Sequence, residues 1–147
     1  MSAVAAATLA ISALQRALAA EQAASYGFGV VGAHLAGRAL TAATADWVAH
    51  QRARDALEQL LTARGARPAP AAVAYRLPFA VGTAREAVSL AVILADRVAA
   101  AYLGLVAVSE PALRRLGAAR LQACALEAAR WRGSTVAFPG LPGPSPR

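Results

Sequence analysis

Four side chains of the types that bind metal ions lie in stretches of small and apolar residues: Glu21, His50, Asp96 and Glu127. Spacings of three, four and seven residues place mainly alanine, leucine and valine around them, which predicts that they face a helical core. A carboxylate buried without a partner is costly, so such acids need an arginine, a shared proton or a metal ion. Because oxygen and imidazole ligands suit iron or manganese, these four residues are the candidate metal ligands.

The ligand pattern is an incomplete version of the one in di-iron and di-manganese carboxylate bundles. Those bundles use a Glu from each of two helices and a Glu-x-x-His pair from each of the other two. Here Arg130 follows Glu127 where a His is needed, and Trp47 precedes His50 where a Glu is needed. The four candidates could hold one ion, whereas a second ion would lack ligands. One hypothesis is therefore a metal-dependent oxidase or iron-handling protein, since open coordination positions could activate dioxygen.

A metal-free network is the alternative. Arg130 would then pair with Glu127 or Asp96, and His50 would be a hydrogen-bonded core or boundary histidine. Asp96 and Glu127 lie at similar distances from the turn between their helices, whereas Glu21 and His50 differ by about 7 Å at helical rise. We favour a degenerate, metal-free carboxylate and histidine site and leave enzyme activity open.

Prolines and capping residues divide the chain into the four helices that must position these side chains. No proline lies before Pro68, which leaves room for two long helices. Gly65 is placed to follow the second helix in a left-handed conformation, and Thr83-Ala-Arg-Glu86 has the pattern of a capping box. The expected helices run from Ala3 to about Ala36, from Thr41 or Thr44 to Arg64, from Thr83 to about Val108, and from a cap at Ser109 to about Arg132, with Gly133 ending the last.

The connection between the second and third helices, roughly residues 66–82, is too long for the short turn of a simple up-down bundle. When extended it can span a helix of about 36 Å, so it can carry the chain back along the bundle and make these two helices parallel. We therefore predict an all-α, ferritin-like four-helix bundle over residues 1–133, with up-down pairs joined by a long crossover. A Pro-rich C-terminal tail, residues 134–147, follows as a strap or frayed end, although Pro139-Gly-Leu-Pro142 has the spacing of a PxxP ligand.

The composition is that of a helical domain with a basic surface. The chain has 147 residues, is 58% hydrophobic, and has a formal net charge of +7 from 15 basic and eight acidic residues. All the basic residues are arginines, spread singly or in pairs without stacking aromatics, so we expect no nucleic-acid partner. Cys124 is the only cysteine, which excludes a disulfide within the chain.

Membrane insertion is not expected. The most hydrophobic stretch, residues 88–108, is long enough to cross a bilayer, but Asp96 and Arg97 stand at its centre, where charge is costly. No basic segment precedes the uncharged first 15 residues, so we expect no signal peptide and a cytoplasmic protein.

A glycine motif in the first helix imitates a dinucleotide site. Gly27-Phe-Gly-Val-Val-Gly32 matches GxGxxG, which binds pyrophosphate when it follows a strand and opens a helix. The residues before it are helical in pattern, and no acid stands about 20 residues further on. We interpret these glycines as places where a neighbouring helix approaches closely or the first helix bends.

Five of the eight acids have ordinary structural explanations. Asp46, Glu86 and Glu110 are expected in the first turns of helices, where the helix dipole favours negative charge. Asp55 and Glu58 fit an exposed, ion-paired face, with Glu58 four residues from Arg54.

Five segments in order along the chain resemble an uncharacterised family of bacterial ferritin-like domains. The segments are Ala19-Ala-Glu-Gln-Ala-Ala-Ser-Tyr-Gly-Phe-Gly29, His50-Gln-Arg-Ala-Arg-Asp-Ala-Leu57, Tyr75-Arg-Leu-Pro-Phe79, Ala128-Ala-Arg-Trp-Arg132 and Ala137-Phe-Pro-Gly-Leu-Pro142. The resemblance implies the ferritin-like fold, without an established activity. A third hypothesis is a helical interaction module, a homodimer formed through the alanine- and glycine-rich face of the first helix.

Overall fold

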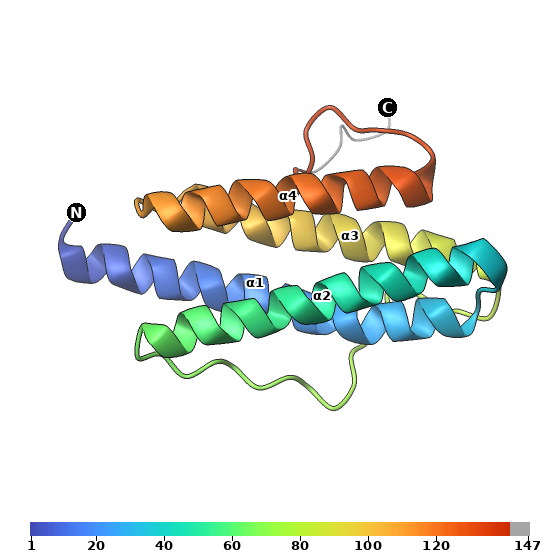
Figure 1. Ribbon diagram of the computed structural model, residues 1–147, viewed down its shortest axis with the longest axis horizontal. Helices are drawn as coiled ribbons and strands as arrows, with labels where there is room; N and C mark the ends of the chain where they lie inside the picture. The colour runs from blue at the N-terminus through green and yellow to red at the C-terminus, as the bar shows by residue number, and fades with distance from the viewer. Residues whose placement is uncertain (142–147) are drawn as a thin grey trace.

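Residues 1–141 form four α-helices and no strand in the computed structural model (Figure 1). The helices are α1 (Ala3–Ala33), α2 (Gly37–Ala63), α3 (Ala84–Val106) and α4 (Pro111–Arg132). The prediction of an all-α chain with four helices is therefore confirmed. Residues 142–147 lie outside the described residues, and with them lie the end of the predicted tail and Pro142 of the PxxP pattern.

The capping signals of α3 and α4 mostly act as predicted. Thr83 and Glu86 form a capping box, in which each side chain accepts a hydrogen bond from the other residue's backbone N–H. Gly133 ends α4 with a φ of +80°. The cap at Ser109 was wrong, because Pro111 is the first residue of α4 and the N-cap therefore falls on Glu110 directly before it.

The turn between α1 and α2 comes earlier than predicted. α1 ends at Ala33, and α2 begins at Gly37 instead of Thr41 or Thr44. Gly37 has a φ of +56°, a left-handed conformation that permits the sharp reversal at this point. Both threonines lie inside α2, where their hydroxyls donate to carbonyls four residues earlier.

The long connection between α2 and α3 runs beside α1 in the same direction as that helix (Figure 1). The Gln15 side chain donates to the carbonyl of Arg67 and accepts from the N–H of Ala69. Further along, the ring of Tyr26 contacts that of Tyr75, with their centroids 5.6 Å apart. The connection thus returns the chain along the bundle, and α2 and α3 run in the same direction.

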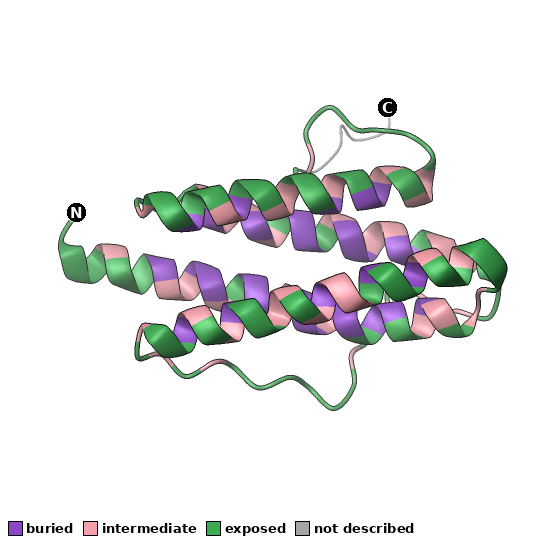
Figure 2. Cartoon of the chain, in the orientation of Figure 1, coloured by how far each residue is buried: buried purple, intermediate pink, exposed green. Residues whose placement is uncertain are grey.

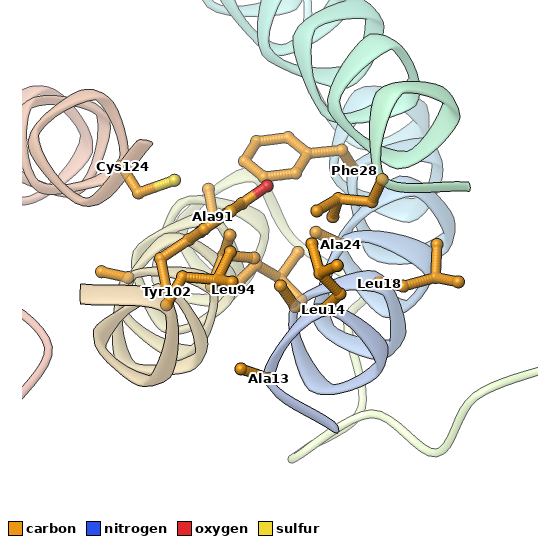
Figure 3. Close-up of a cluster of buried hydrophobic side chains, with 14 of the residues drawn as sticks. Ala13, Leu14, Leu18, Ala24, Phe28, Ala91, Leu94, Tyr102 and Cys124 are labelled. Atoms are coloured by element: carbon orange, nitrogen blue, oxygen red, sulfur yellow. The ribbon is translucent and has the colours of Figure 1, made fainter. Parts of the chain in front are cut away.

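The core lies between α1, α2, α3 and the inner face of α4, and the buried residues form inward stripes (Figure 2). The buried side chains include Leu14, Leu18 and Phe28 from α1 and Leu94 and Tyr102 from α3, with Cys124 of α4 on the opposite side of the core from α1 (Figure 3). Burying a large apolar side chain of this kind contributes about 1.5–3 kcal/mol. Eight of the 22 residues of this hydrophobic core are alanines, whose small side chains keep the helices close together.

The three glycines of the GxGxxG pattern all lie inside α1, so the motif does not follow a strand. Gly27 meets a close neighbour, because a Cβ there would lie 2.5 Å from Leu94 Cδ1. A Cβ on Gly29 would meet nothing within 4 Å. The interpretation of a close helix approach is therefore confirmed at Gly27.

α1 and α3 are each long and apolar enough, by length and composition, to cross a membrane. In α3 the apolar residues Leu90, Leu94 and Val98 lie in the core. The first turns of α1 are more exposed, with Val4 and Leu9 open to solvent (Figure 2). The expected homodimer, cytoplasmic location and lack of membrane insertion stay predictions.

The close contact of α3 and α4 at Gly117 yields a stability prediction. A Cβ at this position would lie 2.8 Å from Leu105 Cβ and 2.9 Å from the backbone nitrogen of Val106. We expect Gly117→Ala to lower the free energy of unfolding by about 2 kcal/mol, because the helices must move apart. Gly29→Ala is the matched control and should raise stability by about 1 kcal/mol through helix propensity alone. Urea denaturation of both variants checks this, and equal effects would contradict it.

Candidate functional site

Three of the four predicted metal ligands meet in the core. His50 on α2 lies between Glu21 on α1 and Glu127 on α4, with Nδ1 2.5 Å from Glu21 Oε2 and Nε2 3.0 Å from Glu127 Oε1. All three residues are buried. The ring of Phe28 stacks on the imidazole with a centroid distance of 5.0 Å, which fixes the ring plane between the two acids.

The second oxygen of Glu21 binds two residues that the sequence did not single out as part of the site. The Tyr102 hydroxyl on α3 donates to Glu21 Oε1 at 2.7 Å, and Arg120 on α4 donates to the same atom at 3.0 Å. The Arg120 guanidinium also lies 5.6 Å from the centroid of the Tyr102 ring. All four helices therefore contribute to one hydrogen-bonded group, which we call the core cluster: Glu21, His50, Tyr102, Arg120 and Glu127.

The environment of His50 favours its protonated form. Burial by itself lowers the pKa of His50, but hydrogen bonds to Glu127 and Glu21, together with their negative charges, outweigh burial and raise the pKa to about 9. At neutral pH the ring is therefore an imidazolium that donates a hydrogen bond to each carboxylate. Two carboxylates, one imidazolium and one guanidinium give the core cluster a formal charge of zero, which is the condition for burying charges at tolerable cost.

Tyr102, Arg120 and Cys124 are held in their ordinary protonation states. Burial raises the pKa of the Tyr102 hydroxyl, and the adjacent Glu21 charge raises it further. Burial lowers the pKa of Arg120, but the Glu21 charge together with smaller contributions from Cys124 and Tyr102 outweighs burial and raises the pKa overall. Burial also raises the pKa of the nearby Cys124 thiol, so this cysteine is an unreactive core residue, as its apolar neighbours suggested.

Asp96, the fourth predicted ligand, is not part of the core cluster. Its side chain is 44% exposed and accepts a hydrogen bond from Arg132 at 2.5 Å. α3 and α4 are antiparallel and meet where Gly117 contacts Leu105, so Asp96 and Glu127 lie at about the same height along the bundle. Asp96 nevertheless lies on a different face of α3 from Tyr102, the residue of α3 that belongs to the core cluster. The apolar row around Asp96 was misleading because Val92, Ile93 and Leu103 are themselves only half-buried.

Arg130 pairs with neither predicted partner. It donates to Asp46 at 3.0 Å, and Trp131 donates to the other oxygen of Asp46 at 2.8 Å. The first-turn explanation of Asp46 was wrong because α2 begins at Gly37, which places this acid in the third turn, buried. Of the two acids expected on an exposed, ion-paired face, Asp55 is exposed and pairs with Arg54, whereas Glu58 is half-buried and forms no ion pair within residues 1–141.

The earlier position of the turn between α1 and α2 also explains why the sequence suggested that Glu21 and His50 differ by about 7 Å along the bundle. Glu21 lies 12 residues before Ala33, and His50 lies 13 residues after Gly37, so the two are level.

Arg120 could have been found from the sequence, since it stands seven residues before Glu127 in an otherwise apolar row. Tyr102 had no comparable signal, because an aromatic residue on a buried stripe is usually a simple core residue.

The polar side chains of the core cluster are already engaged with one another. Within residues 1–141 no group of three or more His, Cys, Asp or Glu side chains is arranged to hold a metal ion. A metal-bound histidine presents a nitrogen lone pair, whereas both ring nitrogens of His50 face carboxylate oxygens. Glu21 Oε1 already accepts hydrogen bonds from Tyr102 and Arg120.

The raised pKa of His50 predicts a specific dependence of stability on pH. The proton binds more tightly in the folded state, so its contribution is complete below pH 6.5 and is lost as the pH rises to about 9. We expect the free energy of unfolding to fall by about 3 kcal/mol over this window. Urea denaturation of the wild type and of His50→Gln at several pH values checks this. Parallel pH profiles for the two proteins would contradict it.

Comparisons with known proteins match almost the whole bundle. The model of a family described as a domain of unknown function, DUF4439, matches residues 13–143. The crystal structure of a conserved hypothetical protein, Rv2844, from Mycobacterium tuberculosis is similar, with a TM-score of 0.83 and 31% sequence identity over 86% of this chain and 96% of that chain. No curated protein matches significantly. The similarity supports the four-helix fold that holds the core cluster, and it assigns no activity.

Proposed function

The chain belongs to the DUF4439 family, a domain of unknown function, and from the chemistry of its core we propose a ferritin-like binding scaffold that uses the His50 cation in place of a metal ion. In this proposal the buried carboxylates of Glu21 and Glu127 stabilise the bundle through their contacts with His50 and Arg120. The domain then acts through its surfaces and pockets, and the alternative is the metal-dependent oxidase or iron-handling protein considered above.

The observation that carries the proposal is the position of His50 between two carboxylates. Each ring nitrogen is within hydrogen-bond distance of a different acid, 2.5 Å from Glu21 and 3.0 Å from Glu127. A metal ion binds only the neutral imidazole, so binding would require the loss of one of the two ring protons, each of which is donated to one of the acids. The same ion would also have to displace both hydrogen bonds.

The ferritin-like assignment is supported by where the residues come from. A carboxylate from α1, a histidine from α2 and a carboxylate from α4 meet at the centre of four helices. The long connection makes α2 and α3 parallel, as in ferritin-like bundles with one crossover. Arg120 and Tyr102 fill the space where further ligands would be needed.

Metal content is the first test of the proposal. We expect protein expressed with iron and manganese in the medium to contain far less than one metal ion per chain by elemental analysis. Manganese, ferrous iron and a chelator should leave its melting temperature unchanged, since ligands that bind the folded state raise it. A stoichiometric metal that is lost in Glu21→Ala would overturn the proposal and support the oxidase.

Charge balance in the core cluster gives a second, independent test. His50→Gln leaves two carboxylates against one arginine and should cost about 3 kcal/mol of stability. Adding Glu127→Gln removes the excess negative charge, so the double variant should be more stable than the sum of the two single changes predicts, by about 1–2 kcal/mol. Glu58→Gln, on α2 like His50, is the control and should change stability by less than about 0.5 kcal/mol. Additive effects would show that the acids and His50 do not act as a charge network.

A further inference from the structure

The connection between α2 and α3 carries a sequence segment that the core cluster does not use, Tyr75-Arg-Leu-Pro-Phe79. This segment covers a cavity of about 330 Å³ between the connection, α1 and α3. We call it the crossover pocket, and it contains no member of the core cluster. Its lining residues are Ala20, Ala23, Ala24, Tyr75, Arg76, Leu77, Pro78, Leu94 and Arg97.

Most of the side chains that line the crossover pocket are apolar, and three of them are the small side chains of alanine. Three alanines of α1 leave the space open, and Leu77 and Leu94 border it from the connection and from α3. Leu94 approaches α1 closely because Gly27 has no side chain. A volume of about 330 Å³ is within the range of pockets that bind small organic molecules.

Two arginines give the crossover pocket its charge. Arg76 on the connection and Arg97 on α3 both line it and are exposed. Neither is in an ion pair with any carboxylate of residues 1–141, and Asp96, the neighbour of Arg97, is bound by Arg132. Guanidinium groups beside an apolar wall favour a carboxylate or a similar anionic group, through charge-assisted hydrogen bonds.

The connection is held in place along α1, so the pocket has a defined wall. Gln15 bonds to the backbone of Arg67 and Ala69, and Gln22 donates to the carbonyl of Ala69. Tyr26 contacts Tyr75 at the edge of the pocket. These contacts give the long connection a structural reason to follow α1 closely.

We propose that the crossover pocket binds a small organic anion, with its apolar body against the alanine and leucine wall and its anionic group held by Arg76 and Arg97. Apolar surface and two cations together discriminate against neutral apolar molecules and against small hydrophilic anions, because each lacks one of the two contributions. The inference goes beyond the scaffold role, since it does not depend on whether the core cluster binds a metal.

The test uses octanoate as the probe and isothermal titration calorimetry on the full chain. We expect saturable binding with a dissociation constant of about 1 mM or lower. Octanamide lacks the charge and acetate lacks the apolar chain, so both should bind at least about 10-fold more weakly. In ¹H–¹⁵N correlation spectra, octanoate should shift the backbone amides of Ala20, Ala24 and Leu77.

Matched variants separate the two halves of the proposal. Arg76→Ala combined with Arg97→Ala should weaken octanoate binding at least about 10-fold, and Ala23→Leu should abolish it by filling the pocket. Arg38→Ala removes an exposed arginine elsewhere on the surface and should bind like the wild type. Circular dichroism melting curves verify that each variant is folded.

The proposal is overturned by any of three results: no saturable octanoate binding to the wild type, equal affinity for octanamide, or octanoate-induced shifts away from the pocket. Unchanged binding in the folded double arginine variant would also overturn it. The spectra of the wild type decide the question even if Ala23→Leu fails to fold.

Discussion

The burial of Glu21 and Glu127 in one helical core is the constraint on which the rest of the structure depends. Two carboxylates removed from water repel each other and require compensating charge. His50 supplies one positive charge at neutral pH, and Arg120 supplies the other. The raised pKa of His50 is thus a consequence of the fold, because the folded chain holds both acids against the imidazole.

The same constraint determines how the helices meet. α1 packs closely with α2 and α3, and α3 packs closely with α4. α2 and α4 are joined instead by polar side chains, through the His50–Glu127 contact and through Asp46 with Arg130 and Trp131. Alanine and glycine allow the close pairs to form, whereas the α2–α4 side is wide enough for an imidazole, a guanidinium and an indole.

Much of the fold follows from local signals in the sequence. The capping box at Thr83, Pro111 at the start of α4 and Gly133 at its end are local features, and each acts as predicted. The start of α2 was misplaced because Gly37 begins the helix in a left-handed conformation, which the more usual cap threonines obscured. That shift of several residues moved Asp46 from a helix start to a buried position.

Tertiary detail accounts for what could not be predicted at the site. Glu21, His50 and Glu127 were recognisable because charged residues on buried stripes are conspicuous. Their partners required knowledge of helix rotation, which depends on packing at contacts such as Gly117 with Leu105. α4 shows the result, because three of its arginines each bind an acid on a different helix: Arg120 with Glu21 on α1, Arg130 with Asp46 on α2, and Arg132 with Asp96 on α3. Since a rotation or slip of α4 would break all three pairs together, its arginines specify one orientation of the helix in a bundle whose alanine-rich surfaces would otherwise permit several.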